Sequence, residues 1–157
     1  MTMKKKIAIF ILLVLVCLIV LEITTKEKFI DVVGYMAIGN EMGIIGNHIE
    51  AGKAFKRALN MDPYYVPAYL GLGIAYANAG RNKEAIEILK EGIKLNFNHS
   101  SVPKMQISIA SIAFNRMNDQ KTAVQFAKKA LQKYTDQRDY AGVALAGHKL
   151  KLFNQGH

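Results

Sequence analysis

Residues that could perform acid–base or metal chemistry are few in this sequence and lie far apart. The four histidines are His48, His99, His148 and His157. None of them has a second histidine, a cysteine or a carboxylate at the spacing of a metal site, so we predict no zinc or iron site.

The nearest cluster of titratable side chains contains Asp136, Asp139 and His148, which we interpret as turn and capping residues. The sequence also has no glycine-rich phosphate loop and no nucleophile elbow. We therefore predict that the chain is not an enzyme, and that it has neither a cofactor nor a small-molecule substrate.

The elements that position the side chains are indicated by an internal repeat. Small and large apolar residues recur 34 positions apart. The matched pairs are Tyr35 and Tyr69, Ile38 and Leu72, Gly39 and Gly73, Gly46 and Gly80, Ala51 and Ala85, Phe55 and Leu89, Ala58 and Gly92, and Leu59 and Ile93.

A further copy follows at a displacement of 38 residues. Its matched pairs are Gly73 and Ser111, Tyr76 and Phe114, Gly80 and Asn118, Ala85 and Ala123, Gly92 and Ala130, and Ile93 and Leu131. The additional residues fall around 99–103, a polar stretch with a proline that is suited to a longer turn. The spacing predicts helices near 30–44, 47–61, 66–79, 82–95, 103–117, 119–134 and 139–153.

The small residues of the repeat have two predicted tasks. Gly46, Gly80 and Asn118 fall where a helix must end and reverse, and glycine and asparagine tolerate the left-handed conformation that ends a helix. The second set lies midway along each first helix, where we expect the close approach of an alanine from the second helix. These predicted pairs are Gly39 with Ala51, Gly73 with Ala85, and Ser111 with Ala123.

In period and in the placement of these residues, 32–135 resembles tetratricopeptide (TPR) helical hairpins. The resemblance implies an all-α, TPR-type α-solenoid of three hairpins, with repeats at about 32–65, 66–99 and 104–137. A capping helix at about 139–153 would cover the last open face. The insertion before the third repeat departs from the family pattern, as does Phe97, which stands where the first repeat has Pro63.

The resemblance further implies that the first helix of each pair lines a concave groove that binds another protein. The implied groove residues are Val33, Met36, Asn40, Ile44, Leu70, Ile74, Ala77, Asn78, Ser108, Ile112, Asn115 and Arg116. This set is mostly apolar with a few amides, which is typical of a groove that accepts an amphipathic helix or an extended apolar segment. Alternatively, Leu70 and Ile74 pack against neighbouring repeats.

The chain carries a net charge of +9, and many of its cations fall on the second helices, which stacking would bring to the convex side. These cations are Lys53, Lys56, Arg57, Lys90, Lys94, Lys128, Lys129 and Lys133. One interpretation is a basic surface that contacts anionic lipid or an acidic partner. The other is a solvated face, and the interleaved glutamates favour this second interpretation. No pattern of alternating aromatic and basic residues suggests nucleic-acid binding.

The first 25 residues have the layout of a signal sequence, with Lys4, Lys5 and Lys6 before the apolar run 7–21. A helix over 7–25 would extend about 28 Å, close to the hydrocarbon thickness of a bilayer. No pair of small residues marks a cleavage site, so we predict an uncleaved transmembrane anchor at 1–25 and a TPR domain at 26–157. Cys17 lacks the small preceding residue of a lipidated cysteine.

The positive-inside rule places the N-terminus in the cytoplasm. We therefore expect a single-pass protein of the bacterial cytoplasmic membrane, with residues 7–25 in the lipid bilayer and the repeats in the periplasm or extracytoplasmic space. Its expected function is that of a scaffold or adaptor that supports a membrane-associated complex. The alternatives are an accessory structural subunit of a large membrane complex and a secreted TPR protein released by signal cleavage.

Overall fold

The computed structural model describes residues 12–16 and 31–155. The chain divides into two units, Met1–Ile30 and Asp31–His157. In the first unit, residues 12–16 are helical and their side chains are exposed. The second unit contains seven helices, and neither described range contains a strand.

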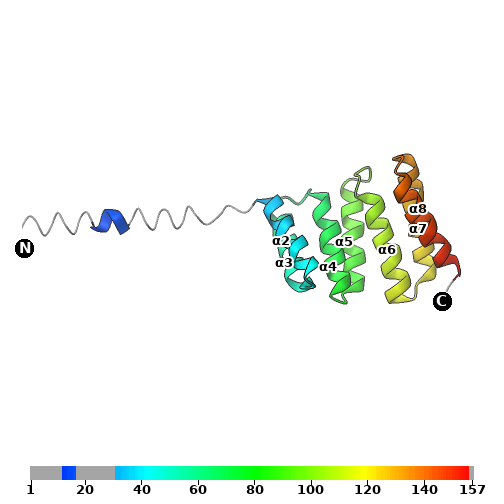
Figure 1. Cartoon of the computed structure of the whole chain (residues 1–157), viewed down its shortest axis with the longest axis horizontal. Coiled ribbons are helices and arrows are strands. Elements are labelled where there is room, and N and C mark those ends of the chain that lie inside the picture. The colour runs from blue at the N-terminus through cyan, green and yellow to red at the C-terminus, as the bar shows by residue number, and fades with distance from the viewer. Residues whose placement is uncertain (1–11, 17–30, 156–157) are drawn as a thin grey trace, which may run out of the picture. The chain divides into compact units, whose positions relative to one another are not determined.

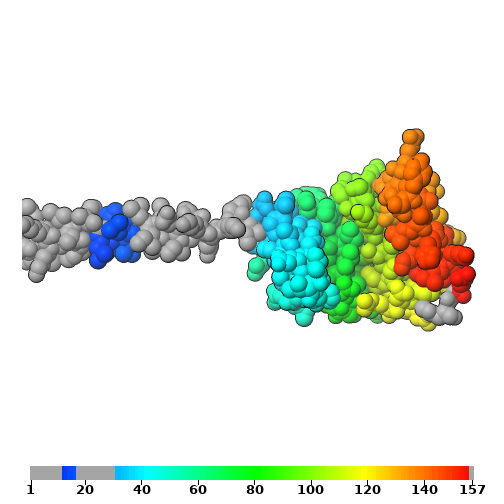
Figure 2. Space-filling view, viewed as in Figure 1, coloured from blue at the N-terminus to red at the C-terminus, as the bar shows by residue number. Residues whose placement is uncertain are grey.

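The helices of the second unit follow one another as antiparallel neighbours (Figure 1). They are α2 (Val32–Ile44), α3 (His48–Met61), α4 (Val66–Asn78), α5 (Asn82–Leu95), α6 (Val102–Met117), α7 (Gln120–Asp136) and α8 (Tyr140–Gln155). The predicted helices are confirmed, and their ends differ from the prediction by no more than a few residues. Three hairpins, α2–α3, α4–α5 and α6–α7, stack in order, and α8 packs on α7 (Figure 2).

Short-range hydrogen bonds and special backbone angles define the helix ends. Asp31 Oδ1 accepts from the Gly34 N–H at 2.7 Å, and Asp139 Oδ1 accepts from the Gly142 N–H at 2.9 Å, so both residues are N-caps. At the C-terminal ends the backbone has positive φ at Gly46, Gly80 and Asn118, with values of 81°, 82° and 52°. The predicted left-handed turns are therefore confirmed.

The core runs along the stack between successive hairpins. Leu72 of α4, Leu89 of α5 and Met105 of α6 are buried in its largest cluster. At the C-terminal end, the Phe153 ring of α8 lies 4.7 Å from the Phe114 ring of α6. Gln120 Nε2 also donates to the Phe153 carbonyl at 2.7 Å, which ties the end of α8 to the start of α7. The C-terminal helix thus covers apolar surface of the last hairpin, as predicted.

The glycines midway along the first helices make room for larger side chains than predicted. A Cβ added at Gly39 would lie 2.6 Å from Phe55 Cε1, and one added at Gly73 would lie 2.5 Å from Leu89 Cγ. The nearest side chains are therefore those one helical turn beyond Ala51 and Ala85. The prediction of tight crossings is confirmed at Gly39 and Gly73, and the side chain nearest to each glycine belongs to the residue one helical turn after the predicted alanine.

The predicted membrane anchor at 7–25 lies outside the described residues except for 12–16. Within the described ranges, no helix combines the length and the hydropathy that crossing a bilayer requires.

Candidate functional site

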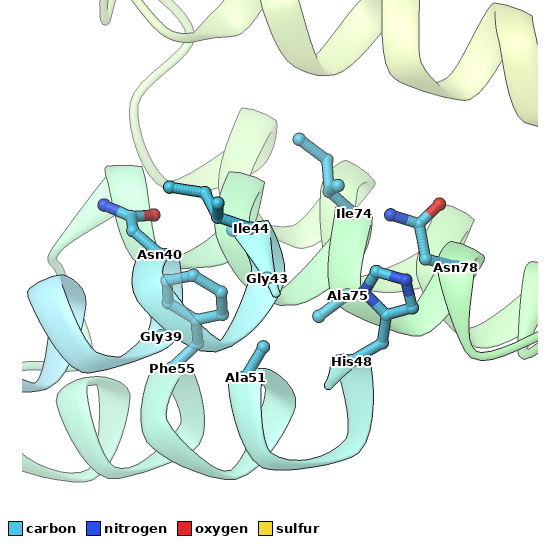
Figure 3. A pocket seen from close by; sticks show the side chains of 11 residues that line it. Gly39, Asn40, Gly43, Ile44, His48, Ala51, Phe55, Ile74, Ala75 and Asn78 are labelled. Atoms are coloured by element: carbon cyan, nitrogen blue, oxygen red, sulfur yellow. The ribbon is translucent and has the colours of Figure 1, made fainter. Parts of the chain in front are cut away.

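A pocket of about 480 Å³ opens between the first two hairpins (Figure 3). Side chains of α2 and α4 flank it, and side chains of α3 lie between these two helices. This groove pocket is lined by Gly39, Asn40, Gly43, Ile44, His48, Ala51, Phe55, Gly71, Ile74, Ala75 and Asn78. It lies where the first helices of two successive repeats face each other, which is where the sequence predicts a groove.

Missing side chains create the hollow. A Cβ at Gly39 of α2 or at Gly71 of α4 would lie 2.6 Å from Phe55 Cε1, so the ring of Phe55 packs directly against two glycine backbones. Gly43, one turn after Gly39, has no atom within 4 Å of its Cβ position and faces open space. Gly39 and Gly71 therefore admit the Phe55 ring between the two walls, and Gly43 leaves open space beside it that a larger side chain would fill.

The lining of the groove pocket is apolar and without formal charge. Ile44 is 86% exposed and Ile74 is 43% exposed, although both are large aliphatic side chains. The polar side chains are the amides Asn40 and Asn78, on opposite walls, and the imidazole His48. Such a surface favours an apolar ligand that also offers hydrogen-bonding groups, because amides provide both donors and acceptors.

Four of the predicted groove residues come together in this pocket: Asn40, Ile44, Ile74 and Asn78. Val33 is exposed but does not line it, and Asn115 and Arg116 are exposed on α6. Ser108 is half-buried and donates its hydroxyl to the Lys104 carbonyl at 3.0 Å.

The other predicted groove residues belong to the packed interior. Ala77 and Ile112 are buried, while Met36 and Leu70 are partly buried against the main core. Their expected exposure was wrong, because each first helix packs against its own partner helix and also against the neighbouring hairpin. The alternative that Leu70 packs between repeats is therefore correct, whereas Ile74 remains exposed.

Sequence reasoning missed Gly43 and Gly71, and it did not assign Gly39 or the α3 residues of the pocket to the groove. Gly43 and Gly71 occupy positions where the 34-residue register has Ala77 and Ala37. An exchange of alanine for glycine inside a helix is the one signal that the sequence offered, since glycine there costs stability and often reflects a close contact or an opening.

The basic residues of the second helices are largely engaged with their own neighbours. Lys53 Nζ lies 2.7 Å from Glu50 Oε1, and Lys90 Nζ lies 2.9 Å from Glu87 Oε1. Exposed pairs of this kind contribute about 0–1 kcal/mol. At the start of α5 the Arg81 guanidinium donates to Glu84, and this hydrogen bond lowers the pKa of the Glu84 carboxyl.

The candidate catalytic and metal-binding residues do not form a site in the part of the chain that the structure describes. No three His, Cys, Asp or Glu side chains gather there in a way that could hold a metal ion. Asp139 caps α8, and Asp136 Oδ1 accepts from Gln132 Nε2 at 2.8 Å. Asp139 thus has the capping role that the sequence predicts, whereas Asp136 is the last residue of α7 and bonds a side chain of the same helix.

Comparisons with known proteins relate this architecture to one repeat family. Residues 46–104 match the family described as Tetratricopeptide repeat. No curated protein matches the sequence. Because 46–104 covers the α2–α3 turn, α3, the second hairpin and the start of α6, the match includes the second-hairpin wall of the groove pocket.

Several solved structures share the fold at low sequence identity. PcrH from Pseudomonas aeruginosa has a TM-score of 0.71 at 22% identity, over 78% of this chain and 91% of that one. PcrH in complex with the chaperone binding region of PopD has a TM-score of 0.69 at 22% identity, over 77% and 89%.

The Yersinia enterocolitica type III secretion translocator chaperone SycD has a TM-score of 0.71 at 16% identity, over 79% of this chain and 92% of that one. At these identities the likeness concerns the fold. The helices α2–α8 therefore form an all-helical, TPR-like repeat solenoid, with a tetratricopeptide repeat match at 46–104.

Proposed function

We propose that this chain is a scaffold that holds an apolar segment of a partner protein in the groove pocket between α2 and α4. The observation that carries the proposal is the exposure of Ile44 and Ile74 on opposite walls of a 480 Å³ hollow. Fully burying an aliphatic side chain of this size contributes about 1.5–3 kcal/mol, so these two residues alone provide a substantial part of a binding energy.

The polar lining supports a polypeptide as the ligand. Asn40 and Asn78 can pair with the backbone N–H and C=O groups of a segment that lies between them. The absence of Lys, Arg, Asp and Glu from the lining residues argues against a charged ligand in this pocket. PcrH, which shares the fold, is described in complex with a chaperone binding region of PopD, and by analogy we assign this chain a protein segment as its ligand class.

We also propose that the scaffold is anchored in the bacterial cytoplasmic membrane, with the repeats on the extracytoplasmic side. The support is the apolar run 7–21 behind three lysines, together with the helical conformation and exposed apolar side chains of residues 12–16. The partner would then belong to a membrane-associated complex. An accessory subunit of such a complex and a secreted form released by cleavage are the two alternatives.

Site-specific photo-crosslinking of the full-length chain in cells tests the groove. A photoreactive phenylalanine analogue replaces Ile44 or Ile74 in one set of variants and Leu145 in the control. Leu145 is a suitable control because it is 45% exposed, close to the 43% of Ile74, but lies on α8. We expect a shared protein adduct from positions 44 and 74, with an apolar segment at the crosslinked site. Adducts from position 145 alone, or none from 44 and 74, would refute the proposal.

Carbonate washing of the same membranes tests the anchor separately. A chain inserted through residues 7–25 stays in the pellet, because high pH and salt remove proteins held by charge and not those held by hydrophobic burial. A washed-out protein whose N-terminus lies beyond Thr25 would establish the secreted alternative. That result leaves the groove proposal standing, because the adducts at Ile44 and Ile74 are scored independently.

A further inference from the structure

A second pocket, of about 470 Å³, lies between α5 and α7, the second helices of two successive hairpins. It shares no lining residue with the groove pocket. Apolar side chains, Ile93, Phe97 and Phe126, form much of its wall, and two lysines, Lys129 and Lys133, stand beside them. We refer to this site as the α5–α7 pocket.

One of its lining residues is a buried amide without a partner. Gln106 of α6 is only 2% exposed, and its Oε1 atom has no hydrogen-bond donor. Buried polar groups almost always have a partner, because leaving one unsatisfied destabilises the folded state. The corresponding position of the preceding hairpin, 38 residues earlier, is the fully buried Ala68. Packing at this position therefore does not require a polar side chain, so Gln106 needs another explanation.

Phe97 and Asn98, which lie between α5 and the insertion at 99–103, stand at the rim of the pocket. Phe97, which replaces the proline of the first repeat, is exposed, and Lys133 Nζ lies 3.8 Å from the centre of its ring. Lys133 Nζ also donates to Asn98 Oδ1 at 3.1 Å, across 35 residues of sequence. A cation of α7 is thus held over the aromatic ring that departs from the repeat pattern.

The second lysine is positioned in the same way. Lys129 Nζ lies 5.0 Å from the centre of the Phe126 ring, one turn before Lys133 on α7. Among the described residues, neither lysine has a carboxylate within ion-pair distance, in contrast to Lys53 and Lys90. Asp136 is the acidic residue of the lining, and it accepts from Gln132 Nε2 at 2.8 Å. The pocket therefore combines net positive charge with an aromatic and aliphatic wall.

We propose that the α5–α7 pocket binds an acidic peptide segment of a partner protein. A carboxylate of the peptide pairs with Lys129 and Lys133, and a neighbouring apolar side chain packs against Phe97, Phe126 and Ile93. A backbone N–H of the peptide donates to Gln106 Oε1, which satisfies the buried amide. A lipid headgroup would use the lysines but has no need of an amide that is 98% buried, so the observations favour a peptide. This site is additional to the groove pocket and does not depend on it.

Fluorescence titration of the full-length chain in a nonionic detergent tests the proposal. The probe is a short acetylated peptide of alternating leucine and glutamate, and the control peptide has glutamine in place of glutamate. We expect the acidic peptide to bind about tenfold more tightly, because a charge-assisted contact of about 1.4 kcal/mol corresponds to that ratio. Equal binding of the two peptides, or binding of neither, would overturn the proposal.

Variants of the protein separate the amide from the cations. Gln106→Leu should weaken the acidic peptide about fivefold to tenfold while the melting temperature stays equal or rises, because the variant removes an unsatisfied buried group. Gln106→Ala, which copies Ala68, provides a second variant if leucine does not fit. Full affinity in both variants contradicts the assignment of Gln106. A purely structural role for Gln106 predicts the opposite pattern, a lower melting temperature with unchanged affinity.

The lysines have a matched control within the same chain. Lys129→Gln with Lys133→Gln should abolish the preference for the acidic peptide, whereas Lys53→Gln with Lys90→Gln removes the same charge from paired lysines and should leave it unchanged. Glycerophosphoserine serves as a soluble headgroup probe. If it binds more tightly than the acidic peptide, and equally well to Gln106→Leu, the pocket is a headgroup site and the peptide proposal is wrong.

Discussion

α2 and α6 are both first helices of a hairpin, but they differ strongly in how much of each is buried. In α2 only Gly39 is buried, although the helix is mostly apolar. In α6 nine residues are buried, including Met105, Ile109 and Phe114. α6 packs between α5 and α7 and also contacts α4 and α8, whereas the described neighbours of α2 are α3 and α4.

The difference teaches that position in the stack, and not position in the repeat, decides what a first helix contributes. α6 has neighbours on two sides, so its apolar residues are used for stability. Among the described helices α2 has neighbours on one side, and residues such as Val33 and Ile44 are exposed there. The groove pocket lies beside α2, where apolar side chains such as Ile44 are exposed.

The largest expected effect comes from removing the Phe153 side chain of α8, which packs against α6. Phe153 is 0% exposed and packs on Phe114, so Phe153→Ala should lower the free energy of unfolding by about 3–5 kcal/mol. Tyr140, also an aromatic residue of α8, is 81% exposed, and Tyr140→Ala should change stability by less than about 0.5 kcal/mol. Chemical denaturation of the full-length chain measures both. Equal losses would mean that α8 does not stabilise the stack through Phe153.

A matched pair of isoleucines compares the two helices directly. Ile109 of α6 is fully buried, so Ile109→Ala should cost about 2–5 kcal/mol of stability. Ile44 of α2 is almost fully exposed, so Ile44→Ala should cost less than about 0.5 kcal/mol while weakening the partner in the groove. Urea midpoints at constant slope test the contrast. A large loss for Ile44→Ala would show that α2 is covered in the native protein.

The smallest effect concerns α4, which lies between the two helices. A Cβ at Gly73 would lie 2.5 Å from Leu89 Cγ, so Gly73→Ala should cost about 1–3 kcal/mol through overpacking. Gly147 of α8 has no atom within 4 Å of its Cβ position, and Gly147→Ala should instead stabilise the helix by about 0.5–1 kcal/mol. Melting temperatures that move in the same direction for both variants would contradict the packing around Leu89.

The sequence by itself determined the helices, the hairpins and the turns. Apolar spacing and the 34-residue repeat located all seven helices of the second unit, and Gly46, Gly80 and Asn118 marked the left-handed turns. These features depend on residues close in the chain, because helix periodicity, capping and positive φ are local properties. Four of the twelve predicted groove residues line the pocket, and two of them, Asn40 and Asn78, lie in the C-terminal halves of α2 and α4.

Only the tertiary structure decided which apolar residues face a partner and which face the core. Leu70 and Ile74 are one turn apart on the same helix, yet Leu70 packs inside and Ile74 lines the pocket. The groove hollow includes the open space beside Gly43, and the α5–α7 pocket depends on Lys133 meeting Phe97 and Asn98 across the stack. Exposure is a property of a residue's neighbours in space, and in a solenoid those neighbours come from the adjacent repeats, about 35 residues away in the chain.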